Sequence, residues 1–96
     1  MRRSEALAAQ RDRVLAIAAD HGASNLRVFG SVAKGEDREG SDIDLLVSLE
    51  PGASLYDLAG LMIDFEALLG VKVDVCTERA LHPELRDRII AEARPV

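Results

Sequence analysis

The stretch VFGSVAKGEDREGSDIDLL, residues 28–46, holds the pattern that decides the fold. It begins with a short apolar run that ends at Gly30-Ser31, and it continues as a polar, charged loop. It ends with Asp42 and Asp44, which are separated by one residue and lead into a second apolar run. This order of apolar, glycine-containing and charged segments predicts a strand, a turn, a loop and a second strand.

Outward from this stretch, helical and extended patterns alternate along the chain. Apolar residues at three- and four-residue spacing predict helices, and short apolar runs between turn residues predict strands. The predicted elements are a helix from Ser4 to about Asp20, a strand over 26–29, a turn or brief helix over 31–34, a loop over 35–41, a strand over 43–49, a helix from a Ser54 cap to Leu69, a strand over 71–76, and a helix from Pro83 to about Glu92. Pro95 is predicted to end the ordered chain. The alternation indicates one α/β domain over 1–96, with a small mixed sheet of three strands, room for a short extra strand, and about four helices.

The composition limits the classes of function. Hydrophobic residues make up 48% of the chain and aromatic residues only 3%, so few side chains could stack on single-stranded nucleic acid. The formal net charge is −5, from 17 acidic and 12 basic residues, which argues against direct nucleic-acid binding. No apolar run approaches the length of a membrane span, and the single cysteine excludes an internal disulfide. We therefore expect a cytoplasmic protein without membrane contact.

Asp42 and Asp44 are candidate metal ligands. Side chains alternate along a strand, so residues two apart share a face at roughly 7 Å between Cα atoms. Two carboxylates on one face can converge on a hard cation such as Mg²⁺, which prefers oxygen ligands. An Asp-x-Asp pair by itself is common, however, and also fits two ordinary residues at the edge of a loop.

Asp74 strengthens the metal hypothesis. It lies in the alternating run VKVDVC, although aspartate is disfavoured inside strands. If this strand lies beside the strand that follows Asp42, the three carboxylates share one sheet face, as in two-metal sites for in-line phosphoryl chemistry. The alternative is that Lys72 and Asp74 form only the polar face of an edge strand.

Gly30, Ser31 and Lys34 are candidate phosphate ligands. Backbone N–H groups at a junction between a strand and a helical turn favour an anion, and Gly30 would let a phosphate approach the backbone. The Ser31 hydroxyl can donate one more hydrogen bond, and Lys34 could reach a triphosphate. Each feature alone also fits a plain turn with a solvated lysine.

Together, Gly30-Ser31, Asp42-x-Asp44 and the distal Asp74 resemble the signature of the nucleotidyltransferase superfamily related to DNA polymerase beta. The size of the chain, the segment SDIDLLV and the C-terminal LHPELRDRIIAEARPV make it similar to the minimal nucleotidyltransferases. These MNT domain proteins are the antitoxins of HEPN/MNT toxin–antitoxin pairs. The resemblance covers nearly all residues and implies the nucleotidyltransferase fold.

The resemblance also implies a site and a reaction. Asp42 and Asp44 would each bind two Mg²⁺ ions, Asp74 would complete the site around one of them, and Gly30 and Ser31 would hold the β- and γ-phosphates of ATP. AMP would pass to a tyrosine hydroxyl of a HEPN ribonuclease toxin, with release of pyrophosphate. Many relatives carry arginine where this chain has Lys34, so triphosphate binding here lacks the bidentate guanidinium fork.

Two other functions stay open at this point. The chain could be an antitoxin that neutralises its partner by binding alone, or a nucleotidyltransferase that acts on a small molecule. The sequence also leaves a homo-oligomer open. A complete triad of carboxylates favours the catalytic antitoxin.

Overall fold

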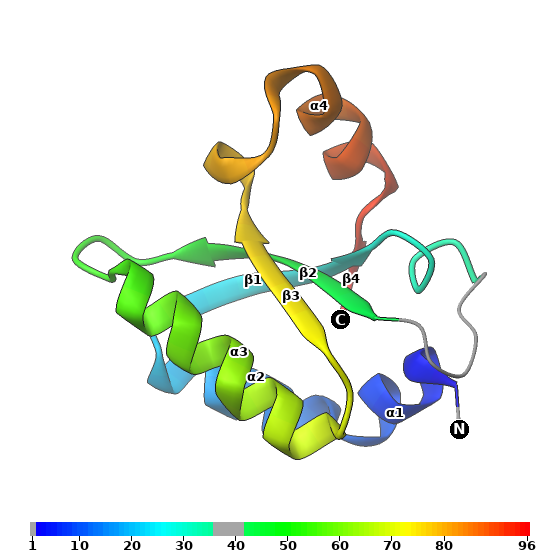
Figure 1. Cartoon of the computed structure of the whole chain (residues 1–96), viewed down its shortest axis with the longest axis vertical. Helices are drawn as coiled ribbons and strands as arrows, with labels where there is room; N and C mark the ends of the chain where they lie inside the picture. The colour runs from blue at the N-terminus through cyan, green and yellow to red at the C-terminus, as the bar shows by residue number, and fades with distance from the viewer. Residues whose placement is uncertain (1, 36–41) are drawn as a thin grey trace.

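The computed structural model describes residues 2–35 and 42–96, and these form a four-stranded mixed sheet with helices on both sides. The elements are α1 (Arg3–Ala9), α2 (Arg11–Asp20), β1 (Ala23–Phe29), β2 (Ile43–Leu49), α3 (Leu55–Leu69), β3 (Val73–Thr77), the short 3₁₀ helix η1 (Glu78–Ala80), α4 (Pro83–Glu92) and β4 (Arg94–Pro95). Figure 1 shows α1, α2 and α3 on one side of the sheet and α4 on the other. The predicted α/β class is thus confirmed.

The strands lie in the order β3-β2-β1-β4. β1 pairs antiparallel with β2 and with β4, and β2 pairs parallel with β3 through the crossover helix α3. Pro95 does not end the order of the chain, which corrects our prediction. Arg94 and Pro95 instead pair with Val28 and Arg27 of β1, because the unpaired edge of β1 accepts a further strand.

The core lies between the sheet and the layer formed by α1, α2 and α3. Ile43, Leu45 and Val47 of β2 are almost completely buried, as are Leu61 and Phe65 of α3. The predicted start of α3 is confirmed: the Ser54 hydroxyl accepts a hydrogen bond from the Tyr56 N–H at 3.2 Å, and Asp57 accepts one from the Ser54 N–H at 2.9 Å. The helix ends at Leu69, as predicted, and Gly70 follows it in the left-handed conformation.

The N-terminal helix differs from the prediction. Helical geometry breaks at Gln10, where φ is −110° and ψ is 16°, so two helices replace one. Ser4 is not the cap, because α1 already begins at Arg3. The break directs α1 toward the turn after β1, where the Arg2 guanidinium donates to the Gly35 carbonyl at 2.9 Å.

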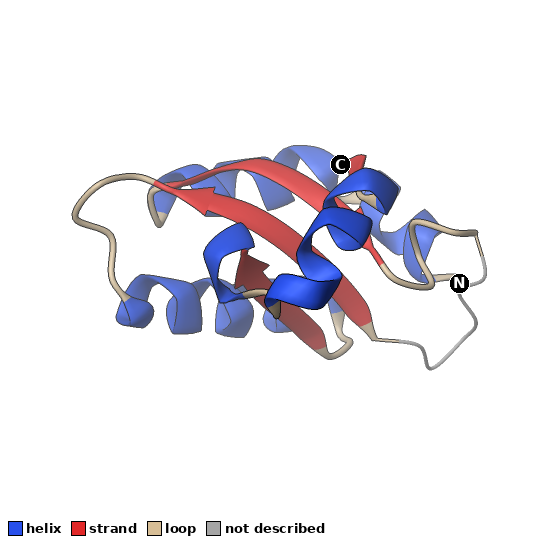
Figure 2. Cartoon of the chain, turned by 90° about the horizontal axis from the view of Figure 1, so that it is seen from above, coloured by secondary structure: helices blue, strands red, loops and turns tan. Residues whose placement is uncertain are grey.

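The strands also differ from the prediction at their ends. β1 begins at Ala23 rather than Leu26, because a bulge with Asn25 at a φ of 51° lets pairing with β2 continue past an irregular residue. β3 covers 73–77 rather than 71–76. Figure 2 shows from above that the sheet separates the helical layers. Among the residues described, no helix is long and apolar enough to cross a membrane.

Candidate active site

Strand pairing brings Asp44 and Asp74 together. β2 and β3 are parallel neighbours, and in their register the Cα atoms of Asp44 and Asp74 are partners. Partners in a ladder point to the same face of the sheet, which here is opposite to the face of Leu45 and Val75. β3 is an edge strand with Asp74 exposed, as the alternative interpretation expected. That edge strand nevertheless lies beside β2, so Asp44 and Asp74 are neighbours on one face of the sheet.

Gly30 brings the turn after β1 against Asp44. Phe29 is the Cα partner of Asp44, and Gly30 follows it with a φ of +70°. A Cβ atom added to Gly30 would lie 2.7 Å from Oδ2 of Asp44, closer than van der Waals contact allows. The positive φ favours glycine here, and a side chain at this position would also make the Asp44 carboxylate shift. The Gly-Ser turn and the strand that carries Asp44 therefore lie directly against each other.

The charges of the cluster act most strongly on Asp44. Asp42 and Asp74 are exposed, whereas Asp44 is half-buried. Burial raises the pKa of Asp44 above its usual 3.8, and the negative charges of Asp74 and Asp42 raise it further. Burial and the negative charges of Asp44 and Asp74 raise the pKa of Cys76, whose Sγ lies 3.7 Å from the Leu45 carbonyl oxygen. The site is therefore a concentration of negative charge.

Its donor chemistry fits a hard cation. Carboxylate oxygens are the ligands that Mg²⁺ prefers, and a cation would relieve the repulsion that raises the pKa of Asp44. Within residues 2–35 and 42–96, however, no three His, Cys, Asp or Glu side chains are arranged closely enough to hold a metal ion. Like charges favour such separation, so binding an ion would require the side chains to rotate toward it.

The turn after β1 forms a single helical turn, as predicted for residues 31–34. The Lys34 N–H donates to the Gly30 carbonyl at 3.2 Å, and the Gly35 N–H donates to the Val32 carbonyl at 3.2 Å. Lys34 Nζ lies 3.9 Å from a Glu92 carboxylate oxygen of α4, with 41% of the lysine side chain exposed. The rest of the predicted loop, residues 36–41, lies outside the described part of the chain.

The sequence did not indicate a role for Arg27, which lies on the same sheet face as Asp44. Its Nη1 donates to Oε1 of Glu78 at 2.9 Å, and its Nε donates to the Asn25 carbonyl at 3.1 Å. Arg86 of α4 donates to the carbonyls of Glu78, Arg79 and Leu81. These bonds hold η1 and the start of α4 to the sheet. The only sequence signal was a charged residue that interrupts a short apolar strand.

Comparisons with known proteins identify what this fold resembles. The family model described as "Nucleotidyltransferase domain" matches residues 12–96. A Methanocaldococcus jannaschii protein named "Putative protein adenylyltransferase" is 44% identical over 81 residues, which cover 84% of this chain and 87% of that protein.

Two solved structures share the fold. One, described as "Structure of putative minimal nucleotidyltransferase", is 53% identical, with a TM-score of 0.87 over 97% of this chain and 95% of its own. The other, described as "Crystal structure of the toxin-antitoxin with AMP-PNP", is 20% identical, with a TM-score of 0.67 over 88% of this chain and 69% of its own. At that identity it shows a common fold alone. The predicted fold is therefore confirmed.

Proposed function

This chain belongs to the nucleotidyltransferase domain family of enzymes, and from that premise we propose that it transfers AMP from ATP to a tyrosine hydroxyl of a HEPN ribonuclease toxin. In this reaction the acceptor oxygen bonds to the α-phosphorus, the bond to the β-phosphate oxygen breaks, and pyrophosphate leaves. The transfer would silence the toxin, so the chain would act as an antitoxin in the cytoplasm.

The carboxylates would hold two Mg²⁺ ions, with Asp42 and Asp44 binding both and Asp74 completing the site around one. When bound, the ions supply charge neutralisation and orientation, which is most of what phosphoryl-type transfer requires. The observation that carries this proposal is the pairing of Asp44 with Asp74 on neighbouring parallel strands. Asp74 would also help to activate the acceptor hydroxyl, since a carboxylate can accept its proton.

The turn at Gly30 and Ser31 would hold the β- and γ-phosphates of ATP, with Lys34 adding one positive charge. The close approach of Gly30 and Asp44 supports this, because the proposed phosphate turn then lies beside one of the proposed metal ligands. No N–H group of Ser31, Val32 or Ala33 donates to a backbone carbonyl of another described residue, so these donors could serve an anion. Lys34 would have to leave Glu92 to reach the phosphates.

The proposed partner and the proposed nucleotide are inferred from the relatives. The Methanocaldococcus jannaschii relative is named as a protein adenylyltransferase, and a protein of the same fold has been crystallised as a toxin–antitoxin with the ATP analogue AMP-PNP. The resemblance to MNT antitoxins points to a HEPN toxin and to its tyrosine. Exposed parts of α4 and the residues after it would carry the interface with the toxin.

The test is to incubate the chain with its HEPN toxin partner and Mg-ATP, and to measure the mass of the toxin. We expect the toxin to gain the mass of AMP with the wild-type chain, and no gain with Asp74→Asn. Asp20→Asn is the matched control, because it removes an exposed carboxylate at the end of α2, which precedes the start of β1, whereas Gly30 follows the end of β1. It should transfer AMP as the wild type does.

Protection of cells separates catalysis from neutralisation by binding. We expect Asp42→Ala to abolish both transfer and protection. A toxin that never gains AMP, together with equal protection by wild type and Asp42→Ala, would overturn the catalytic proposal in favour of binding alone. Transfer that persists in Asp74→Asn would show that Asp74 is not the third ligand.

A further inference from the structure

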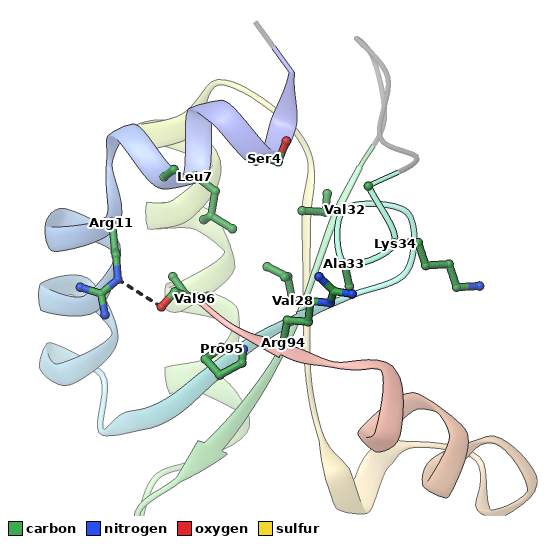
Figure 3. A pocket seen from close by; sticks show the side chains of 12 residues that line it. Ser4, Leu7, Arg11, Val28, Val32, Ala33, Lys34, Arg94, Pro95 and Val96 are labelled. Atoms are coloured by element: carbon green, nitrogen blue, oxygen red, sulfur yellow. Dashed lines mark hydrogen bonds between the residues drawn. The ribbon is translucent and has the colours of Figure 1, made fainter.

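A cavity of about 360 Å³ lies between α1, the turn after β1 and β4, and it is distinct from the carboxylate cluster. Its volume is within the roughly 300–1,000 Å³ that is typical of small-molecule sites. Figure 3 shows α1 on one side, the turn that carries Val32 and Ala33 on another, and β4 below. Val28 of β1 also lines it, and Val28 pairs with Leu45, so the cavity opens on the sheet face opposite to Asp44.

The wall of the cavity is mostly apolar. It is formed by side chains from four separate segments, namely Leu7, Ala8, Val28, Val32, Ala33 and Pro95. Leu7, Val28, Val32 and Ala33 are each no more than 7% exposed, and they belong to the hydrophobic core. The interior is therefore preformed by core packing and would favour an apolar group.

Three cationic residues line the cavity, but Figure 3 shows the Lys34 side chain pointing away from it, so the charge at the cavity comes from two arginines. Arg11 lines it from α2, where its Nε donates to the Val96 carbonyl at 3.1 Å, and this bond fixes the guanidinium beside the cavity. Arg94 lines it from β4, is exposed, and its guanidinium has no hydrogen bond or ion pair with any residue in 2–35 or 42–96. The chain as a whole has a net charge of −5, so this part of its surface differs in carrying two guanidinium groups beside one apolar cavity.

We propose that this cavity binds a small amphipathic anion, with its apolar body against Leu7, Val28 and Val32 and a single carboxylate or phosphate group at Arg94 and Arg11. Arg11 Nη1 lies 3.9 Å from an Asp12 carboxylate oxygen, so a neutral apolar molecule would leave the Arg94 guanidinium in particular without an ionic partner, and inorganic phosphate would leave the apolar wall uncovered. A guanidinium binds either anion through paired N–H donors. The proposed ligand therefore needs both an apolar body and one anionic group.

The same ligand would regulate the nucleotide site. Val32, Ala33 and Gly35 line the cavity, and they belong to the turn that begins at Gly30 and Ser31. A ligand that fixes this turn changes the free energy of binding phosphate at its start, and the effect must be reciprocal. This second step rests on the proposed phosphate role of Gly30 and Ser31, whereas the cavity site itself does not.

The test is a titration of ¹⁵N-labelled chain with octanoate and with octyl phosphate, followed by amide chemical shifts. We expect saturable shifts at Leu7, Ala8, Val32 and Arg94 with both compounds. Octanol, which has the same chain length without the charge, and inorganic phosphate should each bind at least tenfold more weakly. Comparing octanoate with octyl phosphate then shows which anionic group is preferred.

Two variants and one control sharpen the test. Arg94→Gln should weaken octanoate binding about tenfold and leave octanol binding unchanged, since only the charged contact is lost. Ala8→Leu, which puts a larger side chain on an exposed helical position of the wall, should weaken both. Arg13→Gln removes the same charge from α2 at a position that does not line the cavity, and it should bind octanoate as the wild type does.

Shifts confined to other surfaces, non-saturable shifts, or equal binding of octanoate by wild type and Arg94→Gln would overturn the site. The regulatory step is tested by measuring the Kd of AMP-PNP with and without saturating octanoate. We expect a change of at least threefold. Saturable octanoate binding with an unchanged Kd for AMP-PNP would confirm the cavity site and overturn its regulatory role, and neither result bears on whether AMP is transferred.

Discussion

At the residue scale, Gly30 is the position where the proposed phosphate turn meets the proposed metal ligand Asp44. It has a left-handed backbone, and its missing side chain leaves the space that the Asp44 carboxylate occupies. We predict that Gly30→Ala lowers the free energy of unfolding by about 1–2 kcal/mol through backbone strain. It should also abolish AMP transfer, because Asp44 must move. Urea denaturation and the toxin mass assay measure the two effects.

Gly70→Ala is the matched control for Gly30→Ala. Gly70 has almost the same φ, +69°, but a Cβ atom there would meet nothing within 4 Å. The control should lose similar stability and keep full activity. If Gly30→Ala also kept full activity, the contact between Gly30 and Asp44 would have no functional role.

The raised pKa of Asp44 predicts a dependence of stability on pH. The folded chain holds the Asp44 proton more tightly than the unfolded chain does, so the free energy of unfolding falls as the pH rises through the range above 3.8. Removing the charge should therefore stabilise the chain at pH 7. Because Asp44 is only half-buried, we expect Asp44→Asn to raise Tm by only about 2–5 °C.

Thermal unfolding of wild type and Asp44→Asn between pH 4 and pH 7 checks this dependence. The difference in Tm should shrink toward pH 4, where the wild-type carboxyl is increasingly protonated. Adding MgCl₂ at pH 7 should raise Tm of the wild type and not of the variant, since a ligand of the folded state stabilises it. A lower Tm for Asp44→Asn at pH 7 would mean that its carboxylate is not under net repulsion.

At the element scale, the start of α3 is stabilised by an N-terminal cap that lies away from the site. The Tyr56 N–H donates to the Ser54 hydroxyl, and the Ser54 N–H donates to the Asp57 carboxylate. Ser54→Ala should therefore lower the free energy of unfolding by about 1 kcal/mol while AMP transfer is unchanged. Ser24→Ala, an exposed position of β1, is a control that should leave both unchanged. A large loss of activity in Ser54→Ala would link α3 to the site.

Elements with strong local signals could be predicted from the sequence, and those that depend on distant contacts could not. The apolar stripe and caps of α3, the apolar run of β2 and Pro83 at the start of α4 are local features, and each element begins where expected. The break at Gln10 has no glycine or proline to indicate it. The strand at Arg94 exists only because β1 offers an unpaired edge.

At the scale of the whole molecule, the site depends on the packing of a small core, in which one aromatic side chain is completely buried. Phe65 of α3 is completely buried and is the largest such side chain. Phe65→Ala should lower the free energy of unfolding by about 3–5 kcal/mol, a large share of the roughly 5–15 kcal/mol that small domains have. Chemical denaturation measures the loss, and Leu55→Ala, at an 81% exposed position of the same helix, should lose less than about 0.5 kcal/mol.

The site could be predicted only as far as its residue types and spacing allowed. Asp42, Asp44 and Asp74 were candidates from the sequence, but only the parallel register of β2 and β3 shows that Asp44 and Asp74 are neighbours. The clash that a side chain on Gly30 would cause depends instead on the antiparallel pairing of β1 with β2, which brings Gly30 against Asp44. The apolar cavity could not be predicted, because its wall comes from segments at opposite ends of the chain.

The most direct test of the central claim is a crystal structure of the chain with AMP-PNP and Mn²⁺, with the ions located by anomalous scattering. We predict Mn²⁺ bound by Asp42, Asp44 and Asp74, with the β- and γ-phosphates against the N–H groups of Gly30 and Ser31. Mn²⁺ and AMP-PNP bound at another surface, with the three carboxylates still apart, would contradict it.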